Sequence, residues 1–220
     1  TNKIIQLTKD GTDRIINGTF DWVYEEEFGC RDGFRWSPDS KSIAYWQIDA
    51  RKIRNFLMIN NTDSIYSLTV PVEYPKVGED PSMCRVGVVN IGNSKTTWMN
   101  VPGDAVQHYI PRMEWSGKNE LIVQQLDRKQ QESKLIYCNT TDGSSRTFWA
   151  ENDEAWVDLN ASDPAGWNWV NNGQSFLWVS EKDGWRHIYL ISKDGKKETL
   201  LTKGNYDMIG FGAIDEANGY

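Results

Sequence analysis

The sequence predicts an all-β fold, specifically part of a β-propeller built from four-stranded blades. A tryptophan-containing segment is followed by a polar turn and an apolar run three times, within residues 34–46, 113–123 and 167–179. A second hairpin follows each of these segments, and its turn contains a glycine at position 92, 143 or 195. These glycines lie 51 and 52 residues apart. Four short antiparallel strands at a period of about 40 to 50 residues are typical of propeller blades.

The expected strands follow one another in the same order in each unit. They are residues 34–36, 43–46 and 86–89 in the first unit, 113–115, 121–123 and 134–137 in the second, and 167–169, 176–179 and 187–191 in the third. A β-sandwich also has short alternating strands, but it does not predict this order three times. Three units do not close a ring, so we expect residues 1–220 to form an incomplete propeller domain of about three to four blades.

The segment 21–29, which reads Asp-Trp-Val-Tyr-Glu-Glu-Glu-Phe-Gly, is an insertion ahead of the first blade tryptophan. Asp21 is a good N-cap, the glutamates lie where the helix dipole favours negative charge, and Gly29 can end a helix in the left-handed conformation. We therefore expect a short acidic helix here.

A second insertion lies at 51–83, because 56 residues separate Trp36 from Gly92, whereas 28 and 26 residues separate the matching positions of the next two units. Its prolines at positions 71 and 75, within the segment 70–78, suit an extended arm rather than a central strand. The arm is either a plain surface loop or an oligomerisation element.

Glu26 and Glu27 are the candidate binding residues. On a helix their side chains lie about 100° apart and can converge on one cation, whereas on a strand they would point to opposite faces. Two carboxylates and one further acceptor satisfy the three N–H donors of a primary ammonium, such as a peptide N-terminus. Trp22 and Tyr24 can hold the helix on the propeller rim, with Asp21 as its cap. The alternative is a solvated run of charge without a ligand.

Composition argues against several other functions. The net charge of −7 opposes binding of a nucleic-acid backbone. No apolar run approaches the roughly 18 residues that cross a bilayer, and the first residues do not resemble a secretory leader. The three cysteines and two histidines lack metal-ligand spacing, so we expect no metal site and no cofactor. No G-x-S-x-G elbow occurs, so the chain itself has no catalytic residues of that kind.

Cys30, Cys84 and Cys138 form an odd set without C-x-x-C spacing, and we expect buried thiols rather than disulfides. Four N-x-[ST] sequons are compatible with export without showing it, at Asn17, Asn60, Asn139 and Asn160.

Four motifs resemble the dipeptidyl peptidase IV family of the prolyl oligopeptidase clan. Residues 21–27 look like its D-W-V-Y-E-E-E motif, and residues 35–39, Arg-Trp-Ser-Pro-Asp, are similar to its W-S-P-[DN]-G segment. Residues 72–78, Val-Glu-Tyr-Pro-Lys-Val-Gly, resemble V-P-Y-P-K-A-G, and residues 184–188, Gly-Trp-Arg-His-Ile, resemble G-[YW]-R-H-[IL]. The motifs follow in register over nearly the whole chain.

The resemblance implies an eight-bladed propeller with a following α/β-hydrolase domain, which is absent from these residues. It implies that Glu26 and Glu27 bind the substrate's N-terminal ammonium, while a Ser, Asp, His triad in the hydrolase domain releases Xaa-Pro or Xaa-Ala dipeptides. It also implies a homodimer formed through the 51–83 arm, and a secreted, periplasmic or cell-surface protein.

Two other functions stay open at this point. A tripeptidyl peptidase shares much of the scaffold. A non-catalytic propeller would instead bind protein or glycan through exposed tryptophans, although Trp36, Trp115 and Trp169 recur at equivalent positions and are better explained as blade core.

Overall fold

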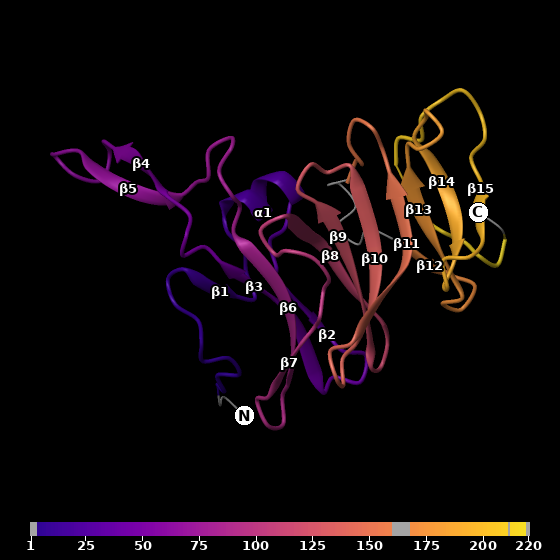
Figure 1. Cartoon of the computed structure of the whole chain (residues 1–220), viewed down its shortest axis with the longest axis horizontal. Helices are drawn as coiled ribbons and strands as arrows, with labels where there is room; N and C mark the ends of the chain where they lie inside the picture. Colours follow the sequence, from indigo (N-terminus) through magenta and orange to yellow (C-terminus); the bar gives the residue numbers. More distant parts are fainter. Residues whose placement is uncertain (1–3, 160–167, 211, 219–220) are drawn as a thin grey trace.

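Three antiparallel sheets lie side by side in the computed structural model, which describes residues 4–159, 168–210 and 212–218 (Figure 1). A two-stranded ribbon projects from the first sheet, and one short helix lies between that ribbon and the second sheet. The predicted all-β, partial propeller with a short acidic helix is confirmed.

The first sheet has five strands rather than the expected four. They are β1 (Ile15–Asn17), β2 (Phe34–Trp36), β3 (Ser42–Asp49), β6 (Met83–Asn90) and β7 (Thr96–Trp98). Both β1 and β2 pair with β3, β2 opposite residues 43–45 and β1 opposite residues 47–49. Two short strands thus share one position in the blade, and the residues between them form an excursion from it.

Gly18 and Gly33 close the base of this excursion. The Gly33 amide donates to the Gly18 carbonyl at 3.1 Å, and both glycines also bond to the backbone of Trp46 on β3, at 3.0 Å each. A Cβ on Gly33 would lie 2.5 Å from the Gly18 carbonyl carbon, so only glycine permits this approach. The segment that carries the helix α1 (Trp22–Phe28) therefore leaves and rejoins the sheet opposite Trp46 of β3.

The second and third sheets are regular four-stranded blades. The second consists of β8 (His108–Gly117), β9 (Glu120–Asp127), β10 (Glu132–Asn139) and β11 (Ser145–Asn152). The third consists of β12 (Asn168–Val170), β13 (Ser175–Ser180), β14 (His187–Ser192) and β15 (Glu198–Leu200). The expected strand 167–169 begins outside the described residues, as does the sequon at Asn160.

The repeated turn glycines join successive blades. Gly143 and Gly195 have positive φ of 78° and 74°, and a Cβ on either would lie 2.1 Å from a carbonyl oxygen of the preceding blade, that of Trp98 or Phe148. In the first hairpin the left-handed residue is Ser94, with φ of 56°, rather than Gly92. At Gly143 and Gly195 the glycine repeat thus reflects close backbone contact between blades.

Apolar side chains fill the spaces between the sheets. One cluster joins the first blade, the second blade and α1, and a second cluster joins the second and third blades through Trp149 and Trp178. Trp115 and Trp169 are half-buried beside these clusters, as expected, but Trp36 is 52% exposed. The interpretation of Trp36 as blade core is wrong, because β2 is an edge strand with no neighbouring strand on its outer side among the described residues.

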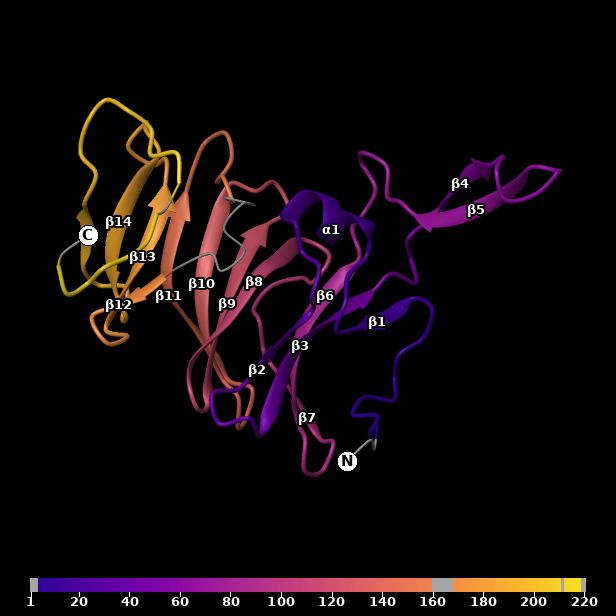
Figure 2. The ribbon, with the colours of Figure 1, turned by 180° about the vertical axis from the view of Figure 1, so that it is seen from behind.

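The ribbon lies within the 51–83 insertion and consists of β4 (Asn55–Asn60) and β5 (Leu68–Glu73) (Figure 2). Pro71 is tolerated in β5 because each strand of a two-stranded ribbon has a free edge. Most of its large apolar side chains are exposed, namely Phe56, Leu57, Met58, Ile59, Ile65, Tyr66, Leu68 and Val70.

All three cysteines are buried free thiols, as expected. No helix within the described ranges has the length and apolar character needed to cross a membrane. In the same residues no group of three or more His, Cys, Asp or Glu side chains could hold a metal ion.

Candidate functional site

The helix α1 begins and ends at the residues the sequence predicts. The Asp21 Oδ1 atom accepts a hydrogen bond from the Tyr24 amide at 3.1 Å, which satisfies one of the free donors of the first turn. Gly29 ends the helix with φ of 63°, and the Cys30 amide donates to the Tyr24 carbonyl at 3.1 Å. The second carboxylate oxygen of Asp21 accepts from the Ser82 hydroxyl at 2.5 Å, which ties the cap to the end of the arm insertion.

Tyr24 attaches the helix to an irregularity in β8. The pairing of β8 with β9 shifts register between Tyr109 and Arg112, so the backbone groups of Ile110 are available to other partners. The Ile110 amide donates to the Tyr24 hydroxyl at 3.0 Å, and its carbonyl accepts from the Trp46 indole at 2.8 Å. Burial raises the pKa of Tyr24 well above its usual range, so the phenol stays protonated.

Two further contacts support the helix. The buried Phe28 packs against Tyr24 and Tyr109, and its carbonyl accepts from the Arg112 guanidinium at 3.1 Å. Trp22 was expected on the propeller rim, but it is 40% exposed and its ring lies 4.3 Å from that of Tyr74 at the base of the arm. The helix is therefore held by the second blade on one side and contacts the arm on the other.

The three glutamates of α1 have different surroundings. Glu25 is half-buried and forms an ion pair with Arg31 at 3.0 Å. Glu27 is exposed, and its Oε1 accepts from the side-chain amide of Gln130 at 2.8 Å. Glu26 is exposed as well. Within the described part of the chain no cation pairs with Glu26 or Glu27, so both negative charges are available to a ligand.

Gln130 is the residue that sequence reasoning missed. It lies 103 residues from Glu27, in the turn between β9 and β10, and has a left-handed φ of 60°. The local signal is a turn-forming Asp127, whose side chain accepts from three following amides at 3.2, 2.6 and 2.7 Å. No periodicity relates this turn to α1, because only the packing of blades brings them together.

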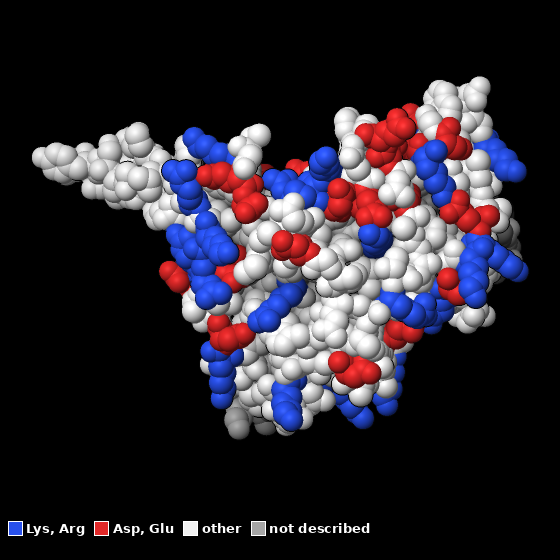
Figure 3. Space-filling model, viewed as in Figure 1, with Lys and Arg blue, Asp and Glu red and all other residues white. Residues whose placement is uncertain are grey.

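The charges around α1 are mixed. In Figure 3 acidic side chains gather along the upper edge of the molecule, with lysine and arginine among them. Tyr109 packs against Phe28 of α1: burial raises the pKa of Tyr109, the nearby Arg128 lowers it, and Glu27 raises it. Arg128 lies 5.5 Å from the Tyr109 ring and donates to the Glu79 carbonyl at 3.3 Å.

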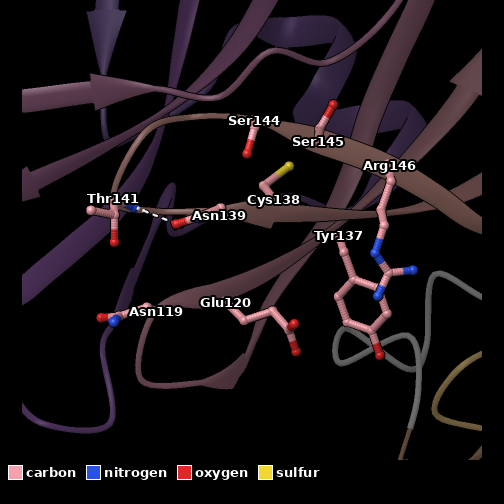
Figure 4. Close-up of a pocket in the computed structure, with 9 residues that line it drawn as sticks. All are labelled: Asn119, Glu120, Tyr137, Cys138, Asn139, Thr141, Ser144, Ser145 and Arg146. Atoms are coloured by element: carbon pink, nitrogen blue, oxygen red, sulfur yellow. Dashed lines mark hydrogen bonds between the residues drawn. The ribbon is translucent and has the colours of Figure 1, made fainter.

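A polar cavity of about 470 Å³ lies at the opposite end of the second blade (Figure 4). Its Asn139 side chain accepts from the Thr141 amide at 2.9 Å, and Arg146 stacks 4.7 Å over the Tyr137 ring. Burial raises the pKa of Cys138 to about 12, so its thiol is not a nucleophile near neutral pH. The residues that line this cavity form no pair of unpaired carboxylates like Glu26 and Glu27 on α1.

Comparisons with known proteins identify the family. The family model described as "Dipeptidyl peptidase IV (DPP IV) N-terminal region" matches residues 1–220. The chain is 30% identical to dipeptidyl peptidase 4 of Trichophyton rubrum, over 97% of the chain and 29% of that protein. It is 28% identical to inactive dipeptidyl peptidase 10 of Rattus norvegicus, over 96% of the chain and 28% of that protein.

A solved structure agrees with these relatives. The crystal structure of Porphyromonas gingivalis dipeptidyl peptidase 4 matches with a TM-score of 0.85 and 32% identity, over 92% of the chain and 29% of that structure. The chain spans less than a third of the length of the relatives it matches. It belongs to the dipeptidyl peptidase IV family, as part of the N-terminal propeller region.

Proposed function

We propose that Glu26 and Glu27 bind the N-terminal ammonium of a peptide, in a parent protein whose separate hydrolase domain removes Xaa-Pro or Xaa-Ala dipeptides. The observation that carries this proposal is the difference among the three glutamates. Arg31 pairs with Glu25, whereas Glu26 and Glu27 are exposed on a helix whose N-cap Asp21 and packing residues Tyr24 and Phe28 are buried. Two carboxylates held this way can compensate the charge of an ammonium and accept its hydrogen bonds.

The position of the clamp would determine the length of the released peptide. A substrate fixed by its N-terminus presents one particular peptide bond to a catalytic group at a constant distance, so the enzyme acts as an exopeptidase. The dipeptidyl peptidase 4 relatives make the dipeptide the favoured product, with tripeptide release as the alternative.

The test compares isosteric variants of the full-length protein. We expect Glu26→Gln and Glu27→Gln each to lower kcat/KM for Xaa-Pro substrates by about a hundredfold or more, because an ammonium that the proposed hydrolase domain covers in the full-length protein loses one charged partner. Glu25→Gln is the matched control, since Arg31 already pairs with Glu25, and we expect a change below about threefold. A loss under threefold for both Glu26→Gln and Glu27→Gln would contradict the clamp.

A non-catalytic binding protein is the second candidate, because a relative named inactive dipeptidyl peptidase 10 is nearly as similar as dipeptidyl peptidase 4. In that case the full-length protein would bind Xaa-Pro peptides without cleaving them. Calorimetry with a peptide and its N-acetylated form measures the clamp in either case, because acetylation removes the ammonium.

We also propose that the parent protein is a homodimer formed through the 51–83 arm. The ribbon β4–β5 exposes a row of large apolar side chains, and over most of its length it shows no charged side chain on the face seen in Figure 3. An apolar projection of this kind is typical of an interface.

A secreted, periplasmic or cell-surface location is part of the same proposal, and cell fractionation with antibodies to the chain tests it.

A further inference from the structure

We propose that Gln130 is a positioning residue that orients the Glu27 carboxylate toward the bound peptide N-terminus. The inference rests on the proposed function of the Glu26 and Glu27 pair. It starts from the hydrogen bond of 2.8 Å that Gln130 Nε2 donates to Glu27 Oε1, across two segments far apart in the sequence. Glutamate has three side-chain torsions, so an exposed carboxylate samples several positions unless a partner selects one.

The backbone of Gln130 is firmly held. Its amide donates to the Asp127 carbonyl at 2.9 Å, and its carbonyl accepts from the Val157 amide at 2.6 Å. The left-handed conformation at this position is one that glycine or asparagine adopts more readily. A glutamine here keeps a side chain where the backbone alone would favour glycine, and that side chain bonds to Glu27.

The chemistry of the amide suits a positioning role. An amide is neutral, so it donates a hydrogen bond to Glu27 without cancelling the negative charge that an ammonium needs. The contrast with Glu25 is direct, because Arg31 supplies a full positive charge there. A cation at position 130 would instead compete with the substrate for Glu27.

Two variants of the full-length protein remove the amide in different ways. Gln130→Met keeps the length and shape of the side chain but cannot donate. Gln130→Gly removes the side chain and relieves the left-handed strain, so its turn should form at least as readily. We expect both to raise KM for Xaa-Pro substrates by about threefold to tenfold, the loss of one hydrogen bond to an exposed carboxylate, with kcat nearly unchanged.

A mutant cycle with Glu27→Ala separates positioning from a general structural effect. In the Glu27→Ala background the acceptor is gone, so Gln130→Met should change KM by less than about twofold. The same rise in both backgrounds would overturn the inference, as would a rise below about 1.5-fold for Gln130→Met and Gln130→Gly in the parent. If Glu27→Ala itself leaves KM unchanged, the proposed ammonium clamp is rejected, and the role of Gln130 is rejected with it. If the parent does not cleave peptides, the Kd for an Xaa-Pro peptide replaces KM in every comparison.

Discussion

The hydroxyl of Tyr24 links α1 to the second blade, and its removal gives a sharp test of this attachment. Tyr24 is only 1% exposed, and its hydroxyl accepts from the Ile110 amide in the irregular part of β8. Tyr24→Phe keeps the ring and its packing against Phe20, Phe28 and Tyr109. The variant therefore deletes the hydrogen bonds of the hydroxyl to the Ile110 amide and to Cys84, and it leaves the buried Ile110 amide without a partner.

The expected cost follows from that unsatisfied amide. A buried donor that loses its partner costs about 1 to 3 kcal/mol. Hydrogen exchange of the full-length protein measures this cost at a single site, because the Ile110 amide is the group that loses its hydrogen bond. If the free energy of local opening around Ile110 falls by about 1 to 3 kcal/mol, amide exchange of the peptide that contains Ile110 becomes about fivefold to 150-fold faster.

The matched control is Tyr66→Phe on the arm, where the side chain is 85% exposed. It makes the same chemical change and should leave exchange at Ile110 unaltered. The attachment of α1 through Tyr24 would be refuted by a Tyr24→Phe protein whose exchange at Ile110 stays within about twofold of the parent. We also expect a rise in KM in Tyr24→Phe, because the helix carries Glu26 and Glu27.

Two further predictions concern the blades and the arm. Gly143→Ala and Gly173→Ala both place a Cβ at a positive φ, 78° and 76°, but only the first meets another atom, the Trp98 carbonyl oxygen at 2.1 Å. Thermal unfolding should therefore show Gly143→Ala to be less stable than Gly173→Ala by about 1 to 3 kcal/mol, and equal melting would contradict the close contact between blades. Replacing residues 55–73 by two glycines should convert a dimer into a monomer in sedimentation velocity, whereas a dimer that survives this deletion places the interface elsewhere.

Local chemistry explains what the sequence could predict. The caps of α1 depend on neighbouring residues, Asp21 and Gly29, and both occur as expected. The blade hairpins depend on turn residues and alternating strands, and they too are local. Gly143 and Gly195 recur because the preceding blade leaves no room for a Cβ at either position, whereas Gly92 of the first unit lacks this constraint.

The remaining features depend on contacts between distant segments. Nothing in the sequence near Gly18 or Gly33 indicates that these two residues meet and divide one strand position of the first blade into β1 and β2. The aromatic character of Trp22 indicates burial but not its partner, and that partner is Tyr74 on the arm. Gln130 looks like an ordinary turn residue until packing brings it to Glu27.

The position of the excursion has a consequence for the geometry of the clamp. The crossing hydrogen bonds of Gly18, Gly33 and Trp46 fix the base of the excursion in a sheet. Tyr24 fixes its middle to β8, and Gln130, which follows β9, fixes the Glu27 carboxylate. Because β8 and β9 pair within one blade, a shift of that blade would move the partners of Tyr24 and Glu27 together. We therefore expect the proposed clamp to keep the position of the Glu27 carboxylate relative to α1 when the second blade moves.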